Sequence, residues 1–255
     1  MRLSIIGAGN MGGAIARALA DGPYFSASDI TCTARSAETL LGLGRDFHTT
    51  TDNLQAVSSA DVVFFAVKPW LMESVVKEVA PAMDLNRQII VSVAAGITFS
   101  QLSEWLGTDK ATIFRIIPNT AIEIGSGVTF ISSVNASEQQ RKMLLDAFLQ
   151  TGYALEVEEA MMTAGTHLAS CGIAYAMKYI QTAAVGGERL GFQKDQAAKI
   201  VEYTVKGAAE LLLATGNPPQ VEIDKVTTPG GMTEKGLAAM DEAGFMQAVL
   251  KSLQL

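Results

Sequence analysis

The stretch Gly7-Ala8-Gly9-Asn10-Met11-Gly12 follows an apolar run at residues 3–6 and precedes a helical pattern at residues 14–19. A strand, a glycine-rich turn and a helix in this order are typical of a loop that binds the pyrophosphate of a dinucleotide. Gly7 lets the chain turn sharply, Gly9 lets a phosphate approach the backbone, and Gly12 lets the helix pack close to the strand. The first amides of the helix then offer a partial positive charge. We therefore predict dinucleotide binding at residues 7–12, with a plain glycine turn as the alternative.

Apolar runs alternate with helical patterns through the first half of the chain. Strands are expected at residues 3–6, 30–33, 62–67, 89–93, 112–117 and 127–131, and helices at residues 36–43, 71–80, 100–106 and 137–151. This alternation is typical of a parallel sheet with helices on both faces. We therefore expect an α/β domain of the Rossmann type, doubly wound with a mostly parallel sheet, over residues 1–155.

The strand patterns stop after about residue 158, and long helical patterns cover residues 160–187, 194–215 and 237–253. We therefore expect an all-α domain over residues 156–255. A helix as apolar as residues 160–184 cannot face water, so it is expected to be buried inside its domain or against another subunit.

The bulk composition narrows the class of protein. The formal net charge of −7 comes without any basic cluster, which disfavours nucleic acid as a partner. No apolar run approaches the length of a membrane span, and the two cysteines, Cys32 and Cys171, form neither a disulfide framework nor a metal motif. We expect a cytoplasmic protein with a small-molecule substrate, no membrane partner and no metal.

The segment after the second expected strand, Ala34-Arg35-Ser36, lacks the acidic residue that NAD sites usually place there. A guanidinium and a hydroxyl suit the 2′-phosphate of NADP through charge-assisted hydrogen bonds. Arg35 and Ser36 therefore favour NADP(H) as the cofactor and leave NAD(H) possible. A solvated surface arginine is the alternative reading of Arg35.

Three further strand ends supply candidate cofactor-binding residues. Ala66-Val67-Lys68-Pro69 leaves one strand at its carboxyl end, where open parallel sheets bind their ligands. Pro69 fixes the turn, and Lys68 either contacts the cofactor or is merely exposed. Ala95 is one of the small residues that leave room for a nicotinamide ring. Asn119 either hydrogen-bonds in the cleft or makes a turn with Pro118.

A rigid turn, Thr228-Pro229-Gly230-Gly231-Met232-Thr233, stands before the last helical pattern. Its glycines expose backbone N–H groups, and such a nest binds a carboxylate well. The Thr233 hydroxyl can both donate and accept a hydrogen bond. We take Thr228, Gly230, Gly231, Met232 and Thr233 as candidate substrate-binding residues, with an ordinary loop between helices as the alternative.

Together these segments resemble the pyrroline-5-carboxylate reductase family over almost the whole chain. The resemblance covers residues 7–12, 52–53, 60–69, 95–97, 115–119, 226–233 and 244–245. The most specific part is Pro-Gly-Gly-x-Thr at residues 229–233, since other nicotinamide reductases share only the amino-terminal motifs. The resemblance implies NAD(P)H-dependent reduction of a cyclic imine carboxylate, 1-pyrroline-5-carboxylate, at C5 to give L-proline, as in proline biosynthesis. It also implies homodimers or larger oligomers with interlocked helical domains.

The same resemblance implies roles for individual residues. Asn53 is expected at the adenosine ribose, and residues 66–69 with Ala95 at the nicotinamide half of the cofactor. The backbone of residues 230–233 is expected to hold the substrate carboxylate, and the Thr233 hydroxyl to bond the ring nitrogen as the catalytic residue. The active site is then expected to be shared between two subunits.

The sequence departs from the family pattern close to the expected imine pocket. Cys171 and Ile173 replace a serine and a proline, Thr163 stands where an aspartate is common, and Met232 replaces a threonine. These departures leave an imine reductase for another cyclic imine as an alternative.

Two further alternatives come from other classes of protein. A β-hydroxyacid dehydrogenase uses a helix lysine with an asparagine one turn later, which Lys178 and Gln181 resemble faintly. A non-catalytic dinucleotide sensor is also conceivable, but the retained Thr233 and Pro-Gly-Gly argue against it, because a sensor needs no carboxylate nest.

Overall fold

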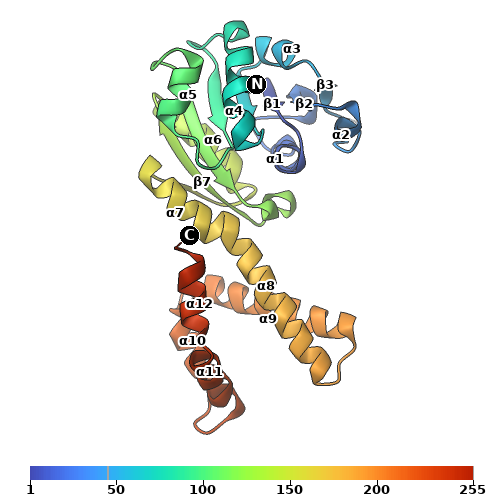
Figure 1. The fold of residues 1–255 in the computed structure, drawn as a ribbon, viewed down its shortest axis with the longest axis vertical. Helices are drawn as coiled ribbons and strands as arrows, with labels where there is room; N and C mark the ends of the chain where they lie inside the picture. Colours follow the sequence, from blue (N-terminus) through green and yellow to red (C-terminus); the bar gives the residue numbers. More distant parts are fainter. Residues whose placement is uncertain (45, 255) are drawn as a thin grey trace. The chain divides into compact units, whose positions relative to one another are not determined.

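The computed structural model of the chain describes residues 1–44 and 46–254, and it divides them into two compact units, Met1–Cys171 and Gly172–Leu255. The expected domain boundary after residue 155 and this division differ in where they place residues 156–171. Each unit is described separately below (Figure 1).

The first unit is built on an eight-stranded sheet with the strand order β3-β2-β1-β4-β5-β6-β7-β8. The pairs are parallel except for β6 with β7, which is antiparallel. The doubly wound, mostly parallel fold expected from the sequence is thus confirmed. The strands are β1 Leu3–Ile6, β2 Ile30–Thr33, β3 His48–Thr50, β4 Val62–Phe65, β5 Ile89–Ser92, β6 Thr112–Pro118, β7 Gly127–Val134 and β8 Gly152–Glu156.

Helices cover both faces of this sheet (Figure 1). The two faces carry separate hydrophobic cores because side chains alternate along each strand. In β4, Phe64 packs into the core beneath α1 and α6, and Phe65 packs into the core beneath α3, α4 and α5. The helices are α1 Asn10–Ala20, α2 Ala37–Leu41, α3 Asn53–Ser58, α4 Pro69–Val79, α5 Phe99–Leu106 and α6 Glu138–Leu149, with short helical turns at Ala27–Asp29, Ala80–Ala82, Thr120–Ile124 and Glu159–Met161.

The expected long helix over residues 160–187 is wrong in its first part. The structure has a short helix, α7 Met162–Gly165, then a π-helical turn, Thr166–Cys171, and only then α8 Gly172–Arg189. At Gly165 a Cβ atom would lie 2.7 Å from the Phe130 ring, so this segment packs tightly against β7. The tight packing and the wider π-helical turn interrupt the helix where apolar periodicity alone predicts one continuous helix.

Over residues 172–254 the regular elements of the second unit are all helices, as expected. After α8 come α9 Lys194–Thr215, α10 Pro219–Val226, α11 Met232–Glu242 and α12 Phe245–Ser252. The expected bounds of α9 are confirmed to the residue. The helical pattern expected over residues 237–253 is divided between α11 and α12 at Gly244, which has a φ of 79°. The sequence reading missed α10.

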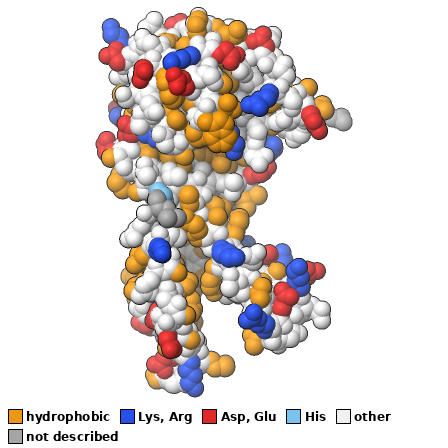
Figure 2. Space-filling view, viewed as in Figure 1, with side chains coloured by type: hydrophobic (Ala, Val, Ile, Leu, Met, Phe, Trp, Pro, Cys, Tyr) orange, Lys and Arg blue, Asp and Glu red, His pale blue; other side chains and the backbone are white. Residues whose placement is uncertain are grey.

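The helical unit leaves many apolar side chains exposed within a single chain. In α8 Met177 is 57% exposed and Val185 is 45% exposed, and in α9 Leu213 is 86% exposed. Hydrophobic side chains are correspondingly common on the surface over these helices (Figure 2). Burial of α8 inside its own domain, one of the two expectations from the sequence, is therefore not what the described residues show.

Candidate active site

The glycine-rich loop joins β1 to α1 at the position where the sheet reverses its winding direction. β1 lies between β2 and β4 and pairs with both in parallel, so chain connections leave its two sides in opposite directions. Open α/β sheets bind ligands in the crevice at this switch point. Two cavities of about 490 and 670 Å³ lie there, and both are lined by Gly9, Ala66, Val67 and Lys68.

The glycines Gly7, Gly9 and Gly12 of the loop differ in how much space surrounds them. Gly7 has a φ of +96°, and a Cβ atom there would lie 2.6 Å from Val67 Cγ1. A Cβ atom on Gly12 would lie 2.4 Å from the Gly7 carbonyl oxygen, so α1 can start this close to the loop only with glycine. A Cβ atom on Gly9 would meet nothing within 4 Å. Gly7 and Gly12 are therefore demanded by the fold, whereas Gly9 borders open space that a ligand can enter.

The start of α1 offers free amides toward this space. Gly9 is the N-cap residue and no side chain caps the helix. The first amides of a helix have no intrahelical acceptor and attract anions. The loop is therefore compatible with a pyrophosphate, and binding of a pyrophosphate there stays a prediction.

The smaller cavity is bounded by residues expected at the adenosine half of a dinucleotide. Gly7, Arg35 and Asn53 line it, and Arg35 is exposed at its edge. Thr33, which the sequence reading missed, joins these parts: its hydroxyl donates to Asn53 Oδ1 at 2.7 Å and its carbonyl accepts from the Ala8 amide at 2.6 Å. Its place as the last residue of β2 was a signal that could have identified it.

The larger cavity is bounded by residues expected at the nicotinamide half. Asn10, Met11, Pro69 and Ala95 line it, together with Ser170 from the π-helical turn. Ser170 was missed because the sequence reading treated its segment as a regular helix. Pro69 occupies the first position of α4, where a proline needs no backbone donor.

An ion pair between a buried arginine and a partly exposed glutamate holds the segment that carries Ser170. Arg115 is 5% exposed, and its Nη1 donates to Glu159 Oε1 at 2.6 Å. The Phe99 amide donates to the same oxygen at 2.7 Å. These bonds fix Glu159, and therefore the start of the segment that leads to the cavity, against β6 and α5.

Four of the expected cofactor-binding residues do not line either cavity. Ala8 and Gly12 are buried in the loop, and Ser36 caps α2 by accepting from the Thr39 amide. Asn119 is buried, and its Oδ1 accepts from the Ala121 amide at 3.2 Å and the Val128 amide at 3.3 Å. The Asn119 side chain thus stabilises the turn in which it lies. Contact with a cofactor stays a prediction.

The candidate substrate turn lies in the helical unit, directly before α11. Gly230 has a φ of +72°, and the Gly231 amide donates to the Thr228 carbonyl at 2.8 Å. α11 starts at Met232 without a side-chain cap, and Met232 is 92% exposed. In the described part of the chain, no hydrogen bond engages the Met232 and Thr233 amides, which leaves them free for an anion.

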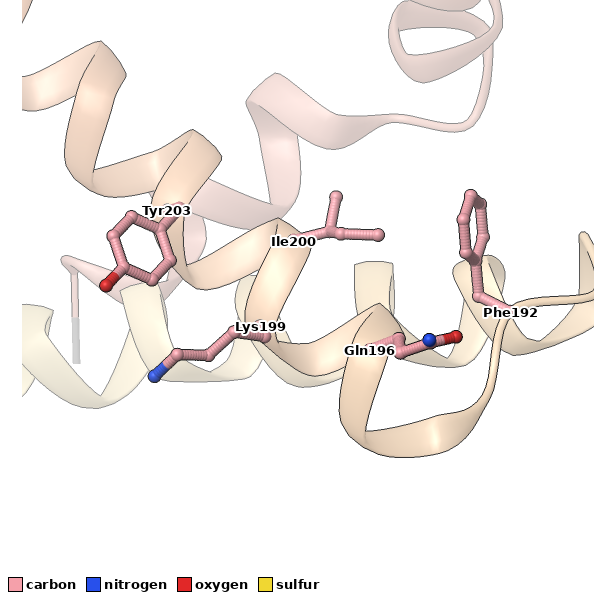
Figure 3. Close-up of a pocket in the computed structure, with 5 residues that line it drawn as sticks. All are labelled: Phe192, Gln196, Lys199, Ile200 and Tyr203. Carbon is pink, nitrogen blue, oxygen red and sulfur yellow. The ribbon is translucent and has the colours of Figure 1, made fainter.

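The helical unit has a further cavity of about 470 Å³ along the start of α9 (Figure 3). Phe192, Ile200 and Tyr203 give it an apolar wall, and Gln196 and Lys199 add polar ends. Tyr203 is 62% exposed and Phe192 is 50% exposed. This wall is part of the exposed apolar surface of the unit.

The Cys32 thiol is buried, and burial raises its pKa to about 12, so this cysteine is unreactive. Neither Cys32 nor Cys171 is in a disulfide. Over residues 1–44 and 46–254 there is no group of three or more His, Cys, Asp and Glu side chains that could hold a metal ion. No helix in the same residues is long and apolar enough to cross a membrane.

The fold and the cleft at its switch point define a dinucleotide-binding oxidoreductase of the doubly wound type. Residues 2–96 match the family model described as NADP oxidoreductase coenzyme F420-dependent, and residues 159–254 match that of pyrroline-5-carboxylate reductase dimerisation. The pyrroline-5-carboxylate reductase of Aquifex aeolicus is 33% identical, over 99% of this chain and 94% of the relative. The chain belongs to the pyrroline-5-carboxylate reductase family.

Two other relatives extend the comparison. Pyrroline-5-carboxylate reductase 1 of Dictyostelium discoideum is 33% identical over 98% of this chain, which spans 48% of that longer protein. The crystal structure of the Plasmodium falciparum pyrroline carboxylate reductase with NADP bound has a TM-score of 0.91, at 24% identity, and covers 100% of this chain and 94% of the other. The common fold therefore includes both units.

Proposed function

We propose that the chain reduces 1-pyrroline-5-carboxylate to L-proline with a nicotinamide dinucleotide. The observation that carries this proposal is that full-length similarity to the family coincides with an intact Pro-Gly-Gly-x-Thr turn and an open cleft at the sheet switch point. A bound NAD(P)H would supply the hydride to C5 of the imine, which binds with its ring nitrogen protonated and positively charged, so that the nitrogen keeps this proton in the product.

The residues of the chain then bind and orient rather than react. The loop at residues 7–12 holds the pyrophosphate, and Ala95 and Pro69 leave room for the nicotinamide in the larger cavity. The Met232 and Thr233 amides hold the substrate carboxylate, and the Thr233 hydroxyl bonds the ring nitrogen. Positioning of this kind accounts for the rate when a cofactor carries the chemistry.

We infer NADP(H) as the preferred cofactor. Arg35 is exposed at the edge of the smaller cavity, on the side of the residues expected to bind adenosine. An exposed guanidinium at this place attracts a 2′-phosphate. The Plasmodium relative, which holds NADP in its crystal structure, supports the same choice.

We also infer that the chain works as a homodimer or a larger assembly. The exposed apolar surface of α8 and α9 is too extensive for a single chain in water, and it lies in the region matched by the dimerisation model. A second copy is the partner that this model implies, with the helical domains interlocked and the substrate turn donated to a partner's cleft.

The test is reduction of 1-pyrroline-5-carboxylate by purified protein, followed by cofactor absorbance with NADPH and with NADH. Thr233→Ala should lower kcat/KM by about tenfold or more, because a hydrogen bond to the charged ring nitrogen is lost. Ser74→Ala, which removes an exposed hydroxyl from α4 outside both cavities, is the control and should keep full activity. Full activity of Thr233→Ala would remove Thr233 from the site, and absence of turnover in the unaltered protein would refute the function.

A further inference from the structure

The substrate turn already contains a carboxylate of its own chain. Glu234 is the third residue of α11, and its Oε2 accepts a hydrogen bond from the Gly230 amide at 2.6 Å. The Gly231 amide is engaged by the Thr228 carbonyl. Of the four amides at residues 230–233, the first is thus occupied by an internal anion and the second by backbone, and the last two have no acceptor among the residues that the structure describes.

We propose that Glu234 is a specificity-determining residue that competes with the carboxylate of the cyclic imine for this turn. The inference rests on the proposed function, because it assumes that the substrate carboxylate binds at residues 230–233. The proposal predicts an effect on substrate preference. The chain should prefer 1-pyrroline-5-carboxylate over the carboxylate-free ring 1-pyrroline, and this preference should become stronger when the Glu234 charge is removed.

The physical basis is the shared positive end of one helix. A carboxylate in the first turn of α11 already takes up part of the attraction that the free amides exert on an anion. A substrate carboxylate on the Met232 and Thr233 amides then lies within the same helical turn as Glu234. Two negative charges within one helical turn repel each other. Lys225, whose Nζ is engaged by Glu222 at 2.7 Å, and Lys235, the next residue of α11, are unchanged in a Glu234 variant, so their charges do not enter the comparison.

The size of the repulsion between Glu234 and the substrate carboxylate depends on how exposed Glu234 is. Glu234 is exposed, so water and salt weaken the repulsion to the range of surface charges. We expect an effect of about fivefold on the affinity for a carboxylate-bearing ring at low ionic strength. An effect of this size changes selectivity and leaves the reaction itself intact.

Glu234→Gln separates charge from hydrogen bonding, because the glutamine oxygen can still accept from the Gly230 amide. We expect its KM for 1-pyrroline-5-carboxylate to fall about fivefold, with kcat, the KM for NADPH and the KM for 1-pyrroline unchanged. Glu242→Gln, at the far end of the same helix and also exposed, is the matched control and should behave as the unaltered protein.

A dependence on salt distinguishes this role from a merely structural one. Added salt screens both the attraction of the helix end and the repulsion by Glu234, but only the repulsion differs between the two proteins, so the KM ratio of the unaltered protein to Glu234→Gln should fall towards one as salt is added. An unchanged KM and an unchanged salt response in Glu234→Gln would overturn the proposal.

Equilibrium binding keeps this inference separable from the proposed function. Cyclopentanecarboxylate, a ring with a carboxylate and no imine, is titrated into the NADPH-loaded protein by calorimetry. Tighter binding to Glu234→Gln than to the unaltered protein supports the inference even where neither imine is reduced, an outcome that would refute the proposed function alone. Equal binding to both proteins, or binding to neither, overturns the inference.

Discussion

Gly9 and Gly12 stand three residues apart in one loop, and the structure predicts opposite consequences for the same added methyl group. A Cβ atom on Gly12 would lie 2.4 Å from the Gly7 carbonyl oxygen and 3.1 Å from Ala66 Cβ. A Cβ atom on Gly9 would meet nothing within 4 Å. Gly12→Ala is therefore expected to damage the fold, and Gly9→Ala to damage ligand binding.

The magnitude for Gly12→Ala follows from the nature of its neighbour. The clash is with backbone, so relief requires a shift of α1 away from the loop, which is an overpacking change of about 1–3 kcal/mol. In a protein of this size such a loss lowers Tm by about 2–12 °C.

For Gly9→Ala two small effects oppose one another. Alanine is a poorer N-cap than glycine by several tenths of a kcal/mol. Alanine also restricts the unfolded chain, which raises the free energy of unfolding by about 0.4–1 kcal/mol. The stability of the cofactor-free protein should therefore stay within about 0.5 kcal/mol, while the new methyl group occupies the space that we assign to the pyrophosphate. Affinity for NADPH should fall about tenfold or more, equivalent to about 1.4 kcal/mol.

Thermal unfolding without cofactor and NADPH titration by calorimetry, applied to both variants, test this reasoning. The expected pattern is a lowered Tm for Gly12→Ala alone, and weakened binding with unchanged Tm for Gly9→Ala. The reasoning is refuted if Gly9→Ala destabilises the cofactor-free protein as much as Gly12→Ala does, or if it binds NADPH as tightly as the unaltered protein.

Two further predictions concern surface charges of the first unit. Arg35→Ala should raise the KM for NADPH about tenfold, through loss of a charge-assisted bond to the 2′-phosphate, and leave the KM for NADH nearly unchanged; Arg141→Ala is the control, and equal effects on both cofactors would contradict the assignment. Asp61 accepts from the Arg2 amide at 2.9 Å and from Arg87 Nη1 at 2.6 Å, and these bonds hold its pKa below the usual 3.8. Because the folded-state pKa is depressed, Asp61 stabilises the protein above the unfolded-state pKa, and this contribution is lost as the pH falls through the folded-state value. The Tm difference between the unaltered protein and Asp61→Asn should be constant near neutral pH and shrink below pH 3.8; a difference independent of pH in acid would contradict this.

The central strands were predictable because both of their faces are buried. β1 and β2 have the expected bounds to the residue, and in both every side chain or nearly every one is buried. The edge strands were missed for the opposite reason. β3 is short and mostly exposed, and in β8 Tyr153 is 58% exposed, so neither carries a run of apolar residues that a sequence pattern detects.

Many residues that line the two cavities could also be predicted from the sequence, because glycine, proline and small residues at strand ends have steric causes that act locally. Their contact with a cofactor stays a prediction. Thr33 and Ser170 were not predicted to line the cavities, since this depends on which strand end or helical turn reaches the cleft.

The sequence by itself determined the glycine loop, the order of strands and helices along the chain, and the Pro-Gly-Gly-x-Thr turn. Those features depend on the conformations that each residue permits and on periodic burial, both of which act over a few neighbouring residues. Only the tertiary structure decided the strand order, the reversed direction of β7, and the contact between the Gly230 amide and Glu234. Pairing between strands and the direction of a side chain depend on the free energy of packing the assembled chain, which no short stretch of residues contains.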